Sequence, residues 1–153
     1  MESIFLTRVL LALLAVALIV AAVGDWRQRL IKNWLTGGIA CAAPLLWLVQ
    51  GYGWWPEIGT QVILAICLFL LFLIFFTIGA MGGGDVKLIA ALGLWFPLNQ
   101  MMNLLLIMSV LGGILTLAML IHHRVTKQAG RPEIPYGIAI SAAGLWVIFQ
   151  TIS

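Results

Sequence analysis

The chain holds two aspartates, and each of them follows glycine at the edge of a long apolar run. Asp25 comes directly after Gly24, and Asp85 comes directly after the three glycines at positions 82 to 84. A carboxylate at the centre of a bilayer costs roughly 2.5 to 3.5 kcal/mol, and less near an interface, so two of them suggest a purpose. Two carboxyl groups held about 3 Å apart share one proton, which lets one act as a general base and the other as a general acid. The pair therefore predicts Asp25 and Asp85 as catalytic residues of an aspartic-protease type of peptide hydrolysis, with no metal, cofactor or covalent intermediate.

The glycines before the second aspartate suit such a site. Gly82, Gly83 and Gly84 carry no side chains, so a substrate backbone can approach closely. A substrate helix in lipid keeps its backbone hydrogen-bonded to itself, and cleavage requires a locally unwound segment. A flexible glycine hinge at the membrane surface is predicted to accept that segment.

Each aspartate also has a purely structural interpretation. Asp85 stands before a helix, where a carboxylate can cap the N-terminus and interact favourably with the helix dipole. Asp25 stands beside Arg27 and Arg29, with which it can form a surface ion pair of little energetic consequence. A joint role is favoured because these are the only two aspartates in the chain and are predicted to lie at the same depth.

The composition indicates a membrane protein. Of the 153 residues, 63% are hydrophobic and 8% are charged, whereas a soluble domain carries about 25% charged residues. The predicted fold class is therefore all-α, a polytopic membrane protein with a single transmembrane domain over residues 1–153. The net charge of +3 comes from a few loops and does not suggest nucleic-acid binding. Cys41 and Cys67 lie inside apolar runs and are predicted to be buried free thiols.

The apolar runs predict six membrane-spanning helices, over residues 4–23, 34–50, 60–78, 86–96, 101–121 and 135–151. A run of about 20 apolar residues can cross the hydrocarbon core. The first run is too long for a cleaved signal peptide, which also needs a positive N-terminal region. With six crossings, seven of the eight Lys and Arg residues fall on one side, which the positive-inside rule makes cytoplasmic. Both termini then face the non-cytoplasmic side, and Asp25 and Asp85 both lie at the cytoplasmic face.

Polar residues near the aspartates have predicted supporting roles. Asn33 is suited to cap the second helix. Lys87 does not share a helical face with the second aspartate and is predicted to contact lipid headgroups. The basic residues Arg27, Arg29 and Lys32 are predicted to bind anionic lipid headgroups, at about 1 kcal/mol each.

Three segments of the chain resemble motifs of the type IV prepilin peptidases. The segment from Gly82 to Gly93 resembles the GxGD motif of that family. The segment from Asp25 to Leu35 resembles its other aspartate motif, in which a basic stretch leads to Ile-Pro-Asn and a leucine, although Lys32 here replaces the proline. Pro135-Tyr136-Gly137, followed by Ala139, resembles a third family segment at the start of the last helix.

This resemblance implies an aspartic endopeptidase of the bacterial cytoplasmic membrane that removes the leader of prepilins or pseudopilins, with Asp25 and Asp85 as the catalytic pair. The small size is similar to the branch that serves tight-adherence (Flp) pili. Larger relatives carry a cytoplasmic insert with four cysteines and also N-methylate the new amino terminus; the lack of such an insert here implies cleavage without methylation. Residues expected to bind substrate or shape the loops around the pair are Gly82, Gly83, Gly84, Lys87, Asn33 and Tyr136.

Two other functions fit parts of the pattern. Paired intramembrane carboxylates also form proton relays, which would make the chain a small proton-coupled transporter. No acidic residue lies within the second, third, fifth or sixth predicted spans to continue such a relay. Alternatively, the glycines serve helix packing in a non-catalytic subunit of pilus assembly, in which case both aspartates would tolerate replacement by asparagine.

Overall fold

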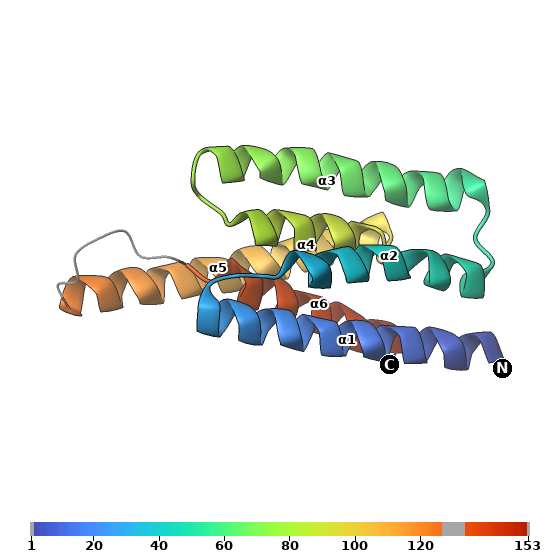
Figure 1. Cartoon of the computed structure of the whole chain (residues 1–153), viewed down its shortest axis with the longest axis horizontal. Helices are drawn as coiled ribbons and strands as arrows, with labels where there is room; N and C mark the ends of the chain where they lie inside the picture. The colour runs from blue at the N-terminus through green and yellow to red at the C-terminus, as the bar shows by residue number, and fades with distance from the viewer. Residues whose placement is uncertain (1, 127–133, 153) are drawn as a thin grey trace.

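The protein is built from helices, as the composition predicts (Figure 1). The computed structural model describes residues 2–126 and 134–152. They form α1 (Glu2–Gln28), α2 (Asn33–Gln50), a π-helical turn η1 (Trp54–Ile58), α3 (Gly59–Thr77), α4 (Gly83–Gly93), α5 (Leu98–Thr126) and α6 (Tyr136–Ile152). Three of these segments are long and apolar enough to cross a membrane, namely Glu2–Gln28, Trp54–Thr77 and Leu98–His122. The all-α class and six α-helices are thus confirmed, whereas six crossings and the sidedness of the termini stay predictions.

Two helices extend beyond their predicted ends. α1 continues through Asp25 to Gln28 and stops where Arg29 takes a positive φ of 52°, a conformation that breaks a right-handed helix. α5 continues to Thr126, because residues 122–126 contain neither glycine nor proline to end it. The loop predicted from residue 122 to residue 133 is therefore helical in its first part, and its remainder, 127–133, lies outside the described residues.

The predicted capping role of Asn33 is wrong. Lys32 is the N-cap of α2, with extended backbone angles, and its carbonyl accepts the first helical hydrogen bonds. Asn33 is already helical, so its side chain lies past the position from which a cap reaches the free amides. Its Oδ1 instead accepts a hydrogen bond of 2.8 Å from Nζ of Lys87 on α4.

Buried residues on three helices follow stripes that lead to the same end of the molecule. On α1 they are Leu11, Leu14, Leu18, Ala21 and Asp25, a spacing of three and four residues that keeps them on one face. The buried face of α4 begins with Asp85 and continues through Leu88, Ile89 and Leu92, and that of α6 begins with Gly137 and continues through Ile140, Ser141 and Gly144. Each stripe thus carries a polar or small residue at one end and apolar residues along the rest.

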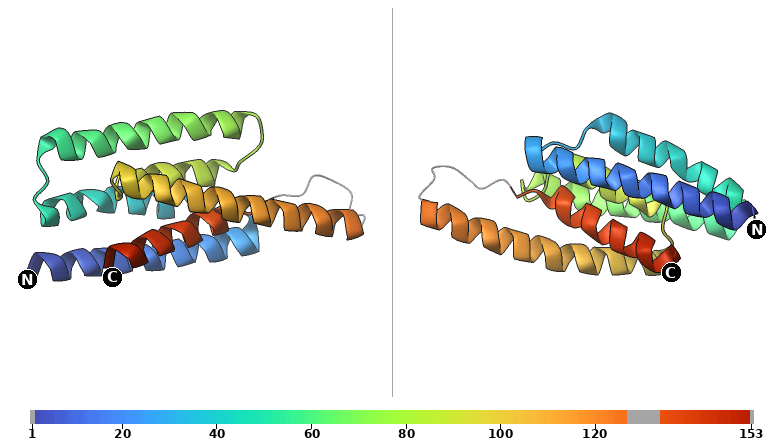
Figure 2. Two further views of the ribbon diagram at one scale, coloured as in Figure 1. Left: turned by 180° about the vertical axis from the view of Figure 1, so that it is seen from behind. Right: turned by 90° about the horizontal axis from the view of Figure 1, so that it is seen from below.

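The helices are arranged so that the short α4 is enclosed by longer ones (Figures 1 and 2). α6 packs on α1, α5 and α4, and α4 packs in addition on α2 and α3. Two indoles join α2 to the far end of α4: Trp47 donates to the carbonyl of Leu94 at 2.9 Å, and Trp95 donates to the carbonyl of Ile39 at 2.8 Å. The first of these bonds satisfies a carbonyl that a helix end leaves unpaired. With its far end fixed, α4 holds its first turn in a defined place.

Candidate active site

Asp25 and Asp85 lie at the same end of the helical bundle, where α1 ends and α4 and α6 begin (Figure 1). Both are buried, with 5% and 6% of their surface exposed. Each keeps part of the structural role that the sequence offered as an alternative, because Asp85 accepts a hydrogen bond from the N-cap amide of its own helix and Asp25 feels the charge of Arg29, but neither is the exposed surface group that this role alone would predict. Asp25 is buried in the last turns of α1 rather than exposed, and Asp85 is in the first turn of α4, where Gly82 is the N-cap.

Each carboxyl group keeps one oxygen without a hydrogen-bond partner among the described residues. These atoms are Oδ2 of Asp25 and Oδ1 of Asp85. Oδ2 of Asp85 accepts a hydrogen bond of 3.2 Å from the amide of Gly82. Buried polar atoms are nearly always paired, so two unpaired carboxyl oxygens at one end of the bundle need an explanation and make this end the candidate active site.

The two aspartates interact electrostatically. Burial, followed by the charge of Asp25, raises the pKa of Asp85 to about 7, while the hydrogen bond from Gly82 lowers it. Burial also disfavours the charged form of Asp25, which the amides of Ile138 and Gly137 and the charge of Arg29 oppose. Asp85 is therefore easily protonated near neutral pH, whereas Asp25 faces two backbone amide donors and a positive charge. Acid–base catalysis needs such a difference between its two groups.

Ile31 is buried in the connection from α1 to α2. The backbones of Gly84 in α4 and Gly137 in α6 both come close to it, so the end of α1 and the beginnings of α4 and α6 meet at this residue. A methyl group on Gly84 would lie 2.9 Å from Cβ of Ile31, and one on Gly137 would lie 2.8 Å from Cδ1 of the same residue. The methyl on Gly137 would also lie 2.8 Å from Oδ2 of Asp25. Only glycine fits at either position without displacing its neighbours.

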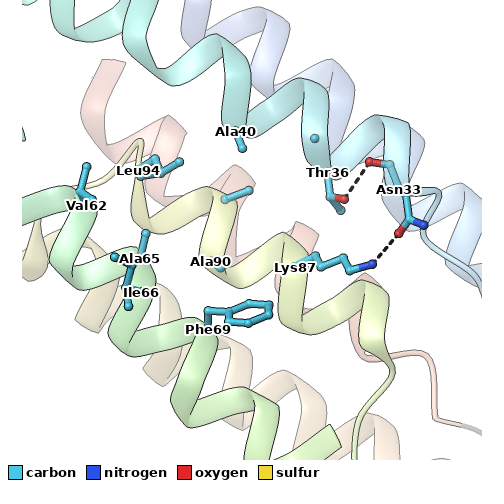
Figure 3. A pocket seen from close by; sticks show the side chains of 12 residues that line it. Asn33, Thr36, Ala40, Val62, Ala65, Ile66, Phe69, Lys87, Ala90 and Leu94 are labelled. Carbon is cyan, nitrogen blue, oxygen red and sulfur yellow. Dashed lines mark hydrogen bonds between the residues drawn. The ribbon is translucent and has the colours of Figure 1, made fainter.

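Lys87 lies on the face of α4 opposite to Asp85. It lines a cavity of about 530 Å³ between α2, α3 and α4, and Figure 3 shows its side chain extending to Asn33. The cavity walls are otherwise mostly apolar: Gly37, Ala40, Val62, Ala65, Ile66, Phe69, Ala90, Ala91 and Leu94. Successive helical residues turn by about 100°, so residues two apart point in nearly opposite directions. Lys87 and Asn33 therefore join α2 to α4 but do not enter the site of the two carboxyl groups.

Tyr136 also points away from that site. Its ring packs against Gly112 of α5, where an added methyl would lie 3.2 Å from Cε1, and its hydroxyl lies 3.4 Å from Oγ1 of Thr116. The residue lines a separate cavity of about 310 Å³ together with Phe75 and Met81. Its contacts thus connect the start of α6 to α5.

Three features of the site were not recognised from the sequence. Ile31 fills the centre, Gly137 approaches Asp25, and Ser141 lies one turn farther along the buried face of α6. A signal for the last was present, because Ser141 follows Gly137 at the helical spacing of four residues within an apolar run. Ile31 stands at the isoleucine position of the segment that resembles Ile-Pro-Asn, but its contacts with Gly84 and Gly137 could not be predicted from the sequence.

Comparison with protein families decides the general class. The model of the type IV leader peptidase family matches residues 12–117, a range that includes both aspartates. The chain belongs to the type IV leader peptidase family. No match was found among curated proteins or among solved structures with which the chain was compared.

Membership in the type IV leader peptidase family makes this chain a peptidase in general function and agrees with its long apolar helices. The match ends before α6, so the close approach of Gly137 to Asp25 comes from the structure alone. The transporter and assembly-subunit interpretations are not favoured.

Proposed function

We propose that this leader peptidase is an aspartic endopeptidase that uses Asp25 and Asp85 as its catalytic pair. The observation that carries the proposal is the presence of two interacting buried carboxyl groups, each with an unpaired oxygen, at one end of the bundle. One ionised carboxylate accepts a proton from water as that water attacks the peptide carbonyl. The protonated carboxyl group donates its proton to the carbonyl oxygen. The resulting tetrahedral intermediate breaks down as the nitrogen of the leaving peptide takes up a proton.

The substrates we propose are Flp-type prepilins or pseudopilins, cut at the cytoplasmic face of the bacterial cytoplasmic membrane. The small size and the motif around Asp85 support this branch by resemblance. Cys41 and Cys67 are free thiols on exposed helix faces, not buried as predicted, and neither is part of a four-cysteine insert. We therefore propose that the new amino terminus leaves without methylation, which the mass of the mature product would show.

The surrounding residues are proposed to shape the site. Gly82 donates its amide to Asp85 and Gly84 allows the first turn of α4 to approach Ile31. Gly83 packs beneath the ring of Phe76 on α3. Lys87, Asn33 and Tyr136 act at a distance by holding α4 and α6 in place, and exposed basic residues of the same end bind anionic lipid headgroups.

The first test is cleavage of a purified prepilin by the protein in liposomes. Asp25→Asn and Asp85→Asn should each lower kcat at least about a hundredfold, the lower range of the effect of losing a general acid or base. Glu57→Gln is the matched control, because Glu57 is an exposed acidic residue at the opposite end of the bundle. Full activity in either aspartate variant would show that the assigned pair is wrong.

A further inference from the structure

A cavity of about 310 Å³ borders the candidate active site on the side of α3 and α5. Two of its lining residues are chain neighbours of glycines that contact the carboxyl groups. Met81 precedes Gly82, whose amide donates to Oδ2 of Asp85 at 3.2 Å. Tyr136 precedes Gly137, where an added methyl would lie 2.8 Å from Oδ2 of the other aspartate. Consecutive Cα atoms are about 3.8 Å apart, so a peptide held over the two aspartates comes within reach of the cavity.

The cavity extends from the level of the aspartates toward the middle of the bundle. An added methyl on Gly112 of α5 would lie 3.2 Å from the ring of Tyr136, which marks the level at which α6 begins. Met108 lies four residues earlier on α5, which is about 6 Å along the helix, and away from the end of α5 that projects past the other helices (Figures 1 and 2). On α3 the lining residues are Phe72 and Phe75, which belong to its last two turns. The cavity thus leads from the aspartates into the apolar part of the bundle.

The described walls of the cavity are apolar. Phe72 and Phe75 form one side, with ring centroids 5.6 Å apart, and Met81 and Met108 contribute flexible thioethers. Ser109 donates its hydroxyl to a carbonyl of its own helix at 2.7 Å, and none of the described lining residues is charged. Methionine adapts to partners of different shapes, whereas burying a charge without a partner is costly. The cavity therefore suits apolar side chains of more than one shape.

The size of the cavity decides between a helix and an extended segment. A helix with its side chains is about 10 to 12 Å wide and rises about 5.4 Å per turn, so each turn occupies roughly 400 to 600 Å³. The cavity is smaller than one such turn, although it reaches the size at which ligand pockets begin, about 300 Å³. It therefore holds a few side chains of an unwound segment. Cleavage of a substrate in lipid requires the substrate to unwind locally, so the two requirements agree.

We propose that this cavity binds the apolar segment of the substrate that directly follows the cut. This inference rests on the proposed function, which puts the cut at Asp25 and Asp85. The segment after the cut is the occupant because the cavity leads from the aspartates into the bundle, whereas a leader at the cytoplasmic face lies outside it. A lipid chain would also suit apolar walls, but the position of the cavity beside Gly82 and Gly137 favours the peptide that is cleaved there.

Disulfide crosslinking tests which part of the substrate occupies the cavity. Cys41 and Cys67 are replaced by alanine, Asp85→Asn keeps the prepilin uncut, and Gly113→Cys puts a thiol on the wall formed by α5. Under mild oxidation, a prepilin with one cysteine close after the cut should crosslink, and a prepilin with its cysteine in the leader should not. Gly38→Cys on α2 is the matched control, because an added Cβ at Gly113 or at Gly38 meets no neighbour within 4 Å, and Gly38 does not line the cavity.

Three results of the crosslinking would overturn the inference. They are no crosslink at Gly113→Cys, a crosslink to the leader alone, and equal crosslinks at Gly38→Cys. Failure of the proposed function gives a different result, because the Asp85→Asn protein would then cut the prepilin or the unmodified protein would not.

Filling the cavity tests its contribution to binding. Gly113→Leu narrows the cavity and should raise KM for a prepilin about tenfold, the effect of losing an apolar contact in a pocket. We expect little change in kcat, because the aspartates are unaltered and the lost contact is one of binding. Gly38→Leu is the matched control and should keep the original KM and kcat. If Gly113→Leu does not fold, Ala80→Leu narrows the cavity from the loop between α3 and α4 instead. A cavity that holds a lipid chain would leave KM unchanged in the folded variant, and that result overturns the inference.

Discussion

The raised pKa of Asp85 links this single residue to the stability of the whole protein. The folded protein keeps the Asp85 proton up to about pH 7, whereas the unfolded chain releases it near 3.8. Between those values the unfolded state binds fewer protons, so the free energy of unfolding falls as pH rises from about 4 to about 7 and levels off above. The buried carboxyl group of Asp85, which we propose to be catalytic, thus lowers the stability of the protein at neutral pH.

We therefore predict that Asp85→Asn is more stable than the unmodified protein above about pH 7, and that the difference disappears below about pH 4. Thermal unfolding in lipid nanodiscs at about pH 4, 6 and 8 measures this. Glu57→Gln should follow the unmodified protein at every pH, because Glu57 is exposed. Equal pH dependence in Asp85→Asn and in the unmodified protein would mean that the carboxyl group ionises normally in the folded state.

At the scale of residues, the sequence identifies charges better than contacts. The two aspartates stand out because placing a carboxylate in or near a bilayer costs free energy, and the composition indicates a membrane protein. Asn33 was misassigned because a cap differs from a first helical residue by one position, and a hydrogen bond from Lys87, 54 residues away, decides what its side chain does. The contacts of Ile31 with Gly84 and Gly137 were not predicted, because they depend on which helices are neighbours.

Between elements, the first turn of α4 must approach the connection from α1 to α2 very closely. The methyl of Gly84→Ala would lie 2.9 Å from Cβ of Ile31 and 3.2 Å from its carbonyl oxygen. Neither atom is the end of a flexible side chain, so the turn itself must shift, and Asp85 moves with it. We predict a loss of about 1 to 3 kcal/mol in stability, the usual effect of overpacking, together with a larger loss of cleavage than of substrate binding.

Gly38→Ala is the control for that substitution. Gly38 is also helical and belongs to the adjoining helix α2, but nothing lies within 4 Å of an added methyl. Its replacement should be neutral or mildly stabilising, since alanine favours a helix by about 1 kcal/mol over glycine. The measurements are thermal unfolding and steady-state cleavage of a prepilin. Gly84→Ala with unchanged kcat would show that the distance between α4 and Ile31 does not position Asp85.

The elements themselves were predictable because apolar runs of this length have few other structures available in lipid. The ends of the helices were not predicted, because they depend on local features. Examples are the positive φ of Arg29 and the absence of glycine and proline from residues 122–126. The depth match of Asp25 and Asp85 followed from counting crossings. Their burial and mutual interaction required the packing of α1 and α4 against α6.

For the molecule as a whole, the arrangement of charge predicts its orientation in the membrane. The end that carries Asp25 and Asp85 also carries Arg27, Arg29 and Lys32, whereas the aromatic turn η1 lies at the other end (Figure 1). By the positive-inside rule the basic end faces the cytoplasm. This orientation puts the proposed catalytic pair where an unprocessed leader peptide would meet it.

Single cysteines report that orientation directly. After Cys41 and Cys67 are replaced by alanine, one cysteine is introduced at Gln28, at Ala80 or at Gln50, all of which are exposed. A membrane-impermeant thiol reagent added to spheroplasts should label Gln50→Cys only, and should label Gln28→Cys and Ala80→Cys after permeabilisation. Labelling of Gln28→Cys and Ala80→Cys from opposite sides would separate the two aspartates across the bilayer, and no shared chemistry would then be possible. Labelling of both from outside would keep the pair together but turn its site away from the cytoplasm, which would exclude cleavage of a leader there.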